Sequence, residues 1–129
     1  MSKNKPTGSI VWTDLTVEDA APLREFYTAV AGWKAEPVSM GKYDDYNMTI
    51  PESGETVAGI CHAKGPNIGL PAQWLMYVTV DNLDASIDAC REKGGRVVLG
   101  PKEMGPGSRY AVIQDPAGAV VALYEEKSG

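Results

Sequence analysis

The feature that most constrains the fold of this chain is an internal repeat of about half its length. Gly32 ends a predicted helix and corresponds to Gly95 in the second half, since 95 − 32 = 63. Asp19, near the start of the first helix, corresponds to Asn82 at the same offset. A repeated supersecondary unit predicts a duplicated module, in which the strands and helix of the first half recur in the second.

Each half of the chain has the pattern of a β-α-β-β-β module. The first predicted helix begins near residues 18–19, carries Pro22 in its first turn and ends at Gly32. An apolar stripe at helical spacing predicts the face that packs on the sheet; it comprises Leu23, Phe26, Tyr27 and Val30. The predicted strands are 9–16, 33–37, 43–50, 55–63, 73–80 and 96–99, followed by a hairpin, and the second helix runs from 81 to 93.

The hairpin surrounds the turn-forming sequence DPAG at 115–118. With a four-residue loop, Ala111 faces Ala122 and Arg109 faces Tyr124. Because side chains alternate along strands, these four residues are expected to share one face. Both faces of the hairpin are largely apolar, so one is expected to meet a helix and the other to line a core or a cavity.

The length of 129 residues predicts a single domain. Its expected parts are a loose tail over 1–8 and a domain over 9–127. Module one spans 9–63 and module two 73–127, and the linker 64–72 is rich in Pro and Gly.

Composition excludes several classes of partner. The net charge is −5 and the pI is about 4.8, and the 12 Lys and Arg residues are scattered, so no nucleic-acid partner is expected. The chain shows no apolar signal region and no run of 18 apolar residues, so neither secretion nor membrane insertion is predicted. Cys61 and Cys90 favour free thiols in a reducing cytoplasm over a single disulfide.

Several motifs together resemble the vicinal oxygen chelate superfamily, which includes glyoxalase I, bleomycin-resistance proteins and extradiol dioxygenases. The resemblance covers residues 9–126 and implies an α+β fold, in which two tandem βαβββ modules form a curved mixed sheet around a cavity. It also implies a homodimer. The motifs are WTDL at 12–15, Asp19, Phe26-Tyr27, Gly32-Trp33, VDNLD at 80–84, Gly94-Gly95 and DPAG at 115–118.

The resemblance also implies four metal-ligand positions, one on the first strand and one on the last strand of each module. Here these positions hold Trp12, Ala58, Leu75 and Ala122. None of these side chains offers the nitrogen, oxygen or thiolate donor that a divalent cation requires. We therefore predict no resident metal and no cofactor.

Two residues are candidates for catalysis. His62, the one histidine of the chain, suits a general base but equally a histidine at a strand edge. It is predicted to lie on the side of Ala58, toward the hollow. Asp14 shares a strand face with Trp12 and is expected to be partly buried. Arg109 either pairs with Asp14 or binds an anionic substrate.

An aromatic lining is predicted from Trp12, Tyr43, Tyr46, Met48 and Tyr77, which would suit a planar, apolar ligand or form ordinary core. The predicted ligand-binding set is Trp12, Asp14, Tyr46, Met48, Tyr77, Arg109 and Tyr124.

Three functions follow as hypotheses. The first is a metal-independent small-molecule-binding protein, as the resemblance to bleomycin-resistance proteins implies. The second is a lyase, isomerase or dioxygenase-like enzyme with an atypical site, similar to lactoylglutathione lyase, whose metal would be held by Asp14, His62 or Glu52. The third is an interaction protein whose hollow is filled by side chains.

Overall fold

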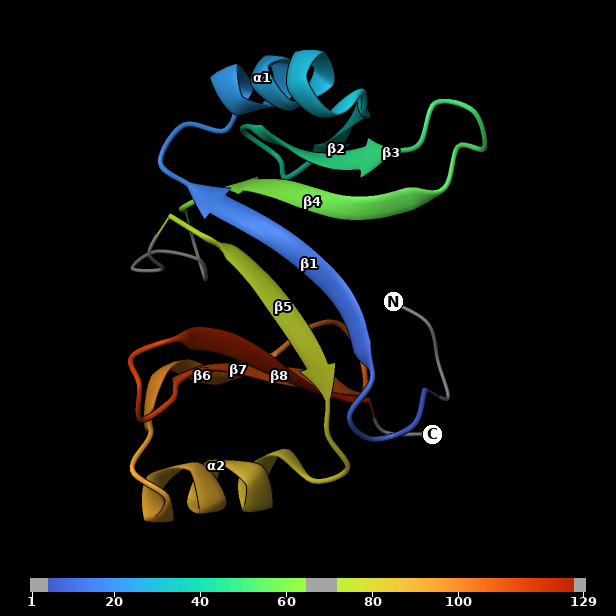
Figure 1. Cartoon of the computed structure of the whole chain (residues 1–129). Helices are drawn as coiled ribbons and strands as arrows, with labels where there is room; N and C mark the ends of the chain where they lie inside the picture. Colours follow the sequence, from blue (N-terminus) through green and yellow to red (C-terminus); the bar gives the residue numbers. More distant parts are fainter. Residues whose placement is uncertain (1–4, 65–71, 127–129) are drawn as a thin grey trace. The chain divides into compact units, whose positions relative to one another are not determined.

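The computed structural model describes residues 5–64 and 72–126 as two compact units (Figure 1). The first unit is Thr13–Trp74, and the second combines Leu75–Gly129 with Met1–Trp12. The elements are β1 (Ile10–Val17), α1 (Ala21–Ala31), β2 (Lys34–Ser39), β3 (Asp44–Thr49), β4 (Thr56–His62), β5 (Trp74–Thr79), α2 (Leu83–Glu92), β6 (Arg96–Glu103), β7 (Ser108–Gln114) and β8 (Val120–Glu126).

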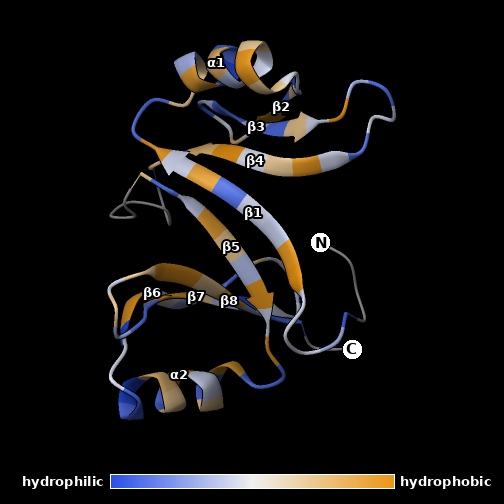
Figure 2. Ribbon diagram, in the orientation of Figure 1, coloured by the Kyte–Doolittle hydropathy of each residue, from blue (hydrophilic) through white to orange (hydrophobic). Residues whose placement is uncertain are grey.

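The sheet of the first unit has the strand order β2-β3-β4-β1. β1 pairs with β4 in parallel, with Asp14 opposite Gly59, whereas β2, β3 and β4 pair antiparallel. β2 lies at the edge, and its Pro37 lacks the N–H that a further strand would need. In Figure 2 apolar colours mark stretches of β4, and polar colours mark the turn that joins β3 to β4.

Helix α1 covers one face of this sheet (Figure 1). Its N-terminus has no side-chain cap bond, although Asp19 Oδ1 accepts a long 3.4 Å hydrogen bond from Ala21 N, and its C-terminus ends at Gly32 in the left-handed conformation. The buried core beneath it consists of Ala20, Tyr46, Met48, Ala58 and Ile60, with Leu23, Tyr27, Trp33 and Trp74 packed against them.

The predicted helical stripe is half wrong. Leu23 and Tyr27 pack on the core, but Phe26 is 52% exposed and Val30 is 66% exposed. An ideal stripe at i, i+3, i+4 and i+7 spans a wide arc, and this short helix contacts the sheet along only one side of that arc.

The second unit repeats the arrangement with the strand order β5-β8-β7-β6. β5 pairs with β8 in parallel, with Tyr77 opposite Ala122. Helix α2 is capped by Asn82, whose side chain accepts from Ala85 N at 3.0 Å, and Leu83 and Ile87 are buried on its inner stripe as predicted. The core beneath α2 consists of Leu83, Ile87, Ala111 and Leu123, with Val78, Val80, Val97 and Ile113 around it.

The predicted register of the hairpin is wrong by one residue. Gln114 pairs with Val120, so the loop holds five residues, and Arg109 faces Glu125 rather than Tyr124. Asp115 explains the difference, because its Oδ1 accepts from both Ala117 N and Ala119 N. A one-residue slip moves side chains to the opposite face of the sheet.

The predicted fold class, α+β with two tandem βαβββ modules, is confirmed, and strand bounds agree within a few residues. The main difference is β6, which continues to Glu103 through Pro101 where a loop was expected. Two register shifts against β7 accommodate this stretch. Residues 1–4 of the predicted tail and 65–71 of the predicted linker lie outside the described residues. The domain limits and the hollow between the modules stay predictions.

Candidate functional site

Each unit has one sheet face that its helix does not cover. In the second unit this helix-free face carries Tyr77 and Ala122 side by side on the parallel strands β5 and β8. Tyr110 on β7 belongs to the same face, and its ring centroid lies 6.3 Å from that of Tyr77 with the planes tilted by 45°. Both tyrosines are buried. The face therefore offers an aromatic surface, which suits planar organic groups.

A row of hydroxyl groups continues this face. Ser108 Oγ lies 3.1 Å from the hydroxyl of Tyr124, which donates to Glu126 Oε2, also at 3.1 Å. Burial is the largest cause that raises the pKa of Tyr124; the hydrogen bond with Ser108 lowers it, and Glu126 raises it. The phenol therefore stays protonated at neutral pH and serves as a hydrogen-bond donor.

Arg109 does not belong to this face. Its guanidinium contacts Asp84 Oδ2 at 3.1 Å and Glu125 Oε2 at 3.5 Å, on the side covered by α2. Arg109 therefore has carboxylate partners within its own unit, and its pairing with Asp14 stays a prediction. Glu125 is also bonded to the start of α2, because its Oε1 accepts from Leu83 N at 2.7 Å. Arg109 thus has a structural position beside a helix terminus.

Tyr46 and Met48 lie on the helix side of the first unit. Both are buried with Ala58 and Ile60 in the core under α1, so they do not line the face expected from the sequence. Tyr46 is additionally covered by Arg24, whose guanidinium carbon lies 5.1 Å from the ring centroid. The alternative weighed from the sequence, ordinary core, describes their surroundings.

The helix-free face of the first unit is polar. Asp14 and Gly59 are partners on β1 and β4, and Cys61 follows two residues after Gly59 on the same side. Burial raises the pKa of the Cys61 thiol, and the carboxylates of Asp14 and Asp45 raise it further. The thiol is therefore protonated, which excludes it as a nucleophile at neutral pH.

His62 lies on the opposite side from Cys61, as its strand position predicted. This side faces α1 rather than the expected hollow. Its Nδ1 is 3.4 Å from Asp45 Oδ1 and its Nε2 is 3.7 Å from Asp19 Oδ1, while the Tyr43 ring meets it edge-on at 5.3 Å. Asp45 also accepts a 2.8 Å hydrogen bond from His62 N. A buried histidine oriented by a carboxylate has the arrangement of a general base.

The raised pKa of the Cys61 thiol should make it react slowly in the native protein. We expect iodoacetamide to alkylate Cys61 at pH 8 at least about tenfold more slowly in the native protein than in urea, since a raised thiol pKa leaves less thiolate. Peptide mass spectrometry gives the rate at this residue. Asp45→Asn should speed the native reaction, whereas the matched change Asp44→Asn on the exposed neighbour should not. Equal rates in native and unfolded protein would contradict the assignment.

The four positions at which metal ligands were expected can now be compared by register. Gly59 faces Asp14 on β4, as Ala122 faces Tyr77 on β8, and both pairs of equivalent residues differ by 63. Gly59 therefore replaces Ala58, which points into the core under α1. The corrected set is Trp12, Gly59, Leu75 and Ala122, which does not fit a divalent cation because it contains no donor side chain. Within the described residues, no three acidic, His or Cys side chains gather as metal ligands would.

Sequence reasoning missed three residues of these faces. Tyr110 and Ser108 were placed away from Tyr124 because of the register error, and the correct loop length would have found them. Asp45 gave no signal, since it is one of two adjacent aspartates and only the fold decides which is buried. Trp12 and Asp14 lie on β1 as predicted, and Asp14 is buried.

Comparison with known proteins agrees with this architecture. A family model described as Glyoxalase/Bleomycin resistance protein/Dioxygenase superfamily matches residues 9–123. A Mycobacterium tuberculosis protein named "Putative glyoxylase CFP32" is 35% identical over 121 residues, covering 92% of this chain and 46% of the relative. The anthracycline biosynthesis protein DnrV of Streptomyces peucetius is 32% identical over 131 residues, covering 92% and 47%. The chain thus spans about half the length of these curated relatives.

Solved structures share the fold at low sequence identity. A methylmalonyl-CoA epimerase of Streptomyces coelicolor in complex with 2-nitronate-propionyl-CoA gives a TM-score of 0.57 at 16% identity, covering 95% of this chain and 97% of that one. The Mycobacterium tuberculosis methylmalonyl-CoA epimerase gives 0.54 at 20% identity, covering 98% and 93%. Separately, neither helix in the described residues has the length and apolarity needed to cross a bilayer.

Proposed function

Because the chain belongs to the glyoxalase/bleomycin resistance protein/dioxygenase superfamily, we propose that it binds a small, partly aromatic molecule without a resident metal. The observation that carries this proposal is the donor-free set Trp12, Gly59, Leu75 and Ala122 at the superfamily's ligand positions. A metal ion would find no coordinating side chain at these four positions.

We place the ligand against the helix-free face of the second unit. Tyr77 and Tyr110 supply two aromatic rings tilted to each other, and the hydroxyls of Ser108 and Tyr124 supply polar contacts. A few polar groups beside an aromatic surface are typical of sites that hold organic ligands. Trp12 stays a proposed contributor, and Asp14 stays a candidate on the helix-free face of its own unit. Tyr46, Met48 and Arg109 have structural surroundings in their own units.

The proposal predicts stabilisation by organic ligands and none by metals. We expect at least one compound from a set of small uncharged aromatic amides and quinones to raise the melting temperature by about 2 °C or more in EDTA, since a ligand that binds the native state stabilises it. Zn²⁺, Ni²⁺ and Mn²⁺ should not raise it. Tyr77→Ala should abolish the ligand shift, whereas Tyr43→Ala, which changes a tyrosine beside His62 in the first unit, should retain it.

Two other functions have an observation each in their favour. An enzyme with an atypical site is favoured by the buried His62–Asp45 pair and by the glyoxylase name of a relative. Turnover of the methylglyoxal–glutathione adduct, lost in His62→Gln, would support it and overturn a pure binding role. An interaction protein without ligand is favoured by the burial of Leu75 and Tyr77. It would stand if no compound shifted the melting temperature.

Assembly and location are part of the proposal. We propose a homodimer, as the resemblance to the superfamily implies. Light scattering at micromolar concentration should give twice the chain mass of 13.8 kDa. Cys61 and Cys90 are free thiols, which supports a reducing compartment such as the cytoplasm.

A further inference from the structure

A concave surface lies on the helix side of the first unit, away from its helix-free face. It is a groove of about 740 Å³ between α1 and β2, and Pro51 also lines it. This volume falls within the range of roughly 300–1,000 Å³ that small-molecule sites occupy. The proposed function does not use this groove.

The groove exists because the local sequence leaves it unfilled. α1 ends at Gly32, where a positive φ of 76° turns the chain directly into β2. A side chain at Gly32 would meet nothing within 4 Å, and its neighbours along the groove, Ala29 and Ala35, are small. Helix and strand therefore diverge without a large side chain between them.

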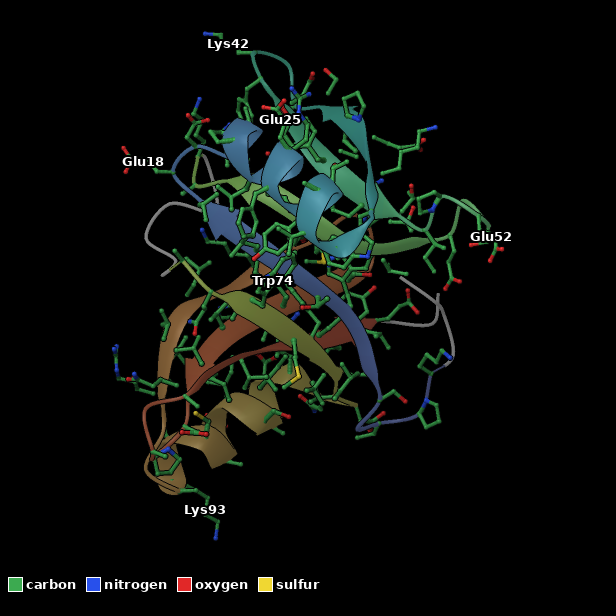
Figure 3. All side chains as sticks on the ribbon, turned by 45° about the horizontal axis from the view of Figure 1, so that its top comes forward. Glu18, Glu25, Lys42, Glu52, Trp74 and Lys93 are labelled. Atoms are coloured by element: carbon green, nitrogen blue, oxygen red, sulfur yellow. The ribbon has the colours of Figure 1, made fainter. Side chains whose placement is uncertain are left out.

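The floor of the groove is aromatic and held in place. Trp33 lines it, and its ring lies 5.8 Å from each of the rings of Tyr27 and Trp74. Trp74 in turn donates from Nε1 to the hydroxyl of Tyr27 at 3.1 Å. Trp74 is labelled beside α1 in Figure 3. Because three rings restrain one another, Trp33 offers a fixed apolar surface to a flat group.

The rim of the groove carries two cations, Arg24 and Lys34. Arg24 is half-buried, its guanidinium is fixed over the Tyr46 ring at 5.1 Å, and no carboxylate within residues 5–64 and 72–126 pairs with it. Lys34 adds a second positive charge, which an exposed 3.8 Å contact with Glu36 satisfies only weakly. Glu25, labelled on α1 in Figure 3, is the one carboxylate among the described residues that line the groove.

We propose that this groove binds an organic anion with a flat aromatic body, of the arenecarboxylate class. The contact with the Tyr46 ring restrains the Arg24 guanidinium, whose N–H groups can form a bidentate bond to a carboxylate. The aromatic body of the ligand lies on Trp33 between Ala29 and Ala35.

The test uses 2-naphthoate as the probe and amide NMR spectra of the full-length protein. Titration should shift the Trp33 indole and Gly32 amide signals together. Arg24→Gln should raise the dissociation constant about tenfold, the usual loss for one charge-assisted contact. Arg91→Gln, which makes the same change on the exposed side of α2, should leave it within about twofold. Glu25→Gln should tighten binding, and the neutral probe 2-naphthamide should bind about tenfold more weakly.

Arg24→Lys controls for misfolding, because it retains the positive charge. Its dissociation constant for 2-naphthoate should lie between those of the native protein and Arg24→Gln. Equal dissociation constants for 2-naphthoate in Arg24→Gln and Arg91→Gln would overturn the proposal. So would signal changes confined to elements outside α1 and β2. Because Tyr77→Ala does not touch this groove, its effect on 2-naphthoate binding separates the two sites: it should have none.

Discussion

Glu125→Ala should lower the free energy of unfolding by about 3 kcal/mol. The Glu125 carboxylate is buried, and its Oε1 accepts from Leu83 N at 2.7 Å, where α2 begins. Its removal leaves a buried N–H without a partner, and it also removes one of the two carboxylates beside Arg109. Loss of a charged hydrogen bond costs roughly 1.5–3 kcal/mol, and an orphaned buried donor adds to that loss. Urea unfolding followed by circular dichroism measures the change.

Two further variants locate the cause. Glu125→Gln keeps an oxygen acceptor for Leu83 N and should cost about 1 kcal/mol, since only the charge is lost. Glu103→Ala, on the exposed side of β6, should change stability by less than about 0.5 kcal/mol. If Glu125→Ala and Glu103→Ala behaved alike, the capping role of Glu125 would be wrong.

The ends of the helices were predictable from sequence because they depend on local chemistry. Gly32 ends α1 in the left-handed conformation and Asn82 caps α2, and both act through their own backbone or their immediate neighbours. The repeat with an offset of 63 then places the same elements in both halves, and the registers Asp14–Gly59 and Tyr77–Ala122 preserve it.

Register was not predictable to the residue, and the candidate site depends on register. Asp115 adds one residue to the hairpin loop by accepting two backbone bonds, which moves Arg109 to the helix side. The position expected on the last strand of module one was likewise Ala58, whereas the ladder selects Gly59. Each error is a single position, but alternation along a strand turns one position into the opposite face.

Neither register error changes the conclusion that the superfamily's ligand positions lack metal-coordinating side chains. Trp12, Gly59, Leu75 and Ala122, as well as the rejected Ala58, all lack a coordinating side chain. A slip of one residue in β4 therefore changes the identity of the position without changing its chemistry. The surroundings of His62 were harder to predict from sequence, because Asp19 and Asp45 approach it from the β1–α1 turn and from β3.

Gly95→Ala should lower the free energy of unfolding by about 3 kcal/mol. A Cβ at this position would lie 2.7 Å from Cys90 Sγ and 2.8 Å from the carbonyl oxygen of Gln114. Gly95 N donates to Cys90 O at 2.8 Å, so the segment between α2 and β6 cannot move away without losing that bond. Overpacking of this kind costs roughly 1–3 kcal/mol, and two simultaneous contacts place the change at the upper end. Thermal and urea unfolding of the variant measure it.

Cys90→Ala provides the matched test, because it removes one of the two clashing atoms and leaves the other. Gly95→Ala should therefore cost about 1 kcal/mol less in the Cys90→Ala background than in the native chain, while the contact with Gln114 O remains. Gly105→Ala serves as the control for a glycine in open space, where only a positive φ of 80° opposes the substitution, and it should cost about 1 kcal/mol. The contrary result would be that Gly95→Ala lowers the free energy of unfolding no more than Gly105→Ala does. That result would show that α2 and β7 move to accommodate the added methyl group, so the close approach at Gly95 does not fix the helix against the hairpin.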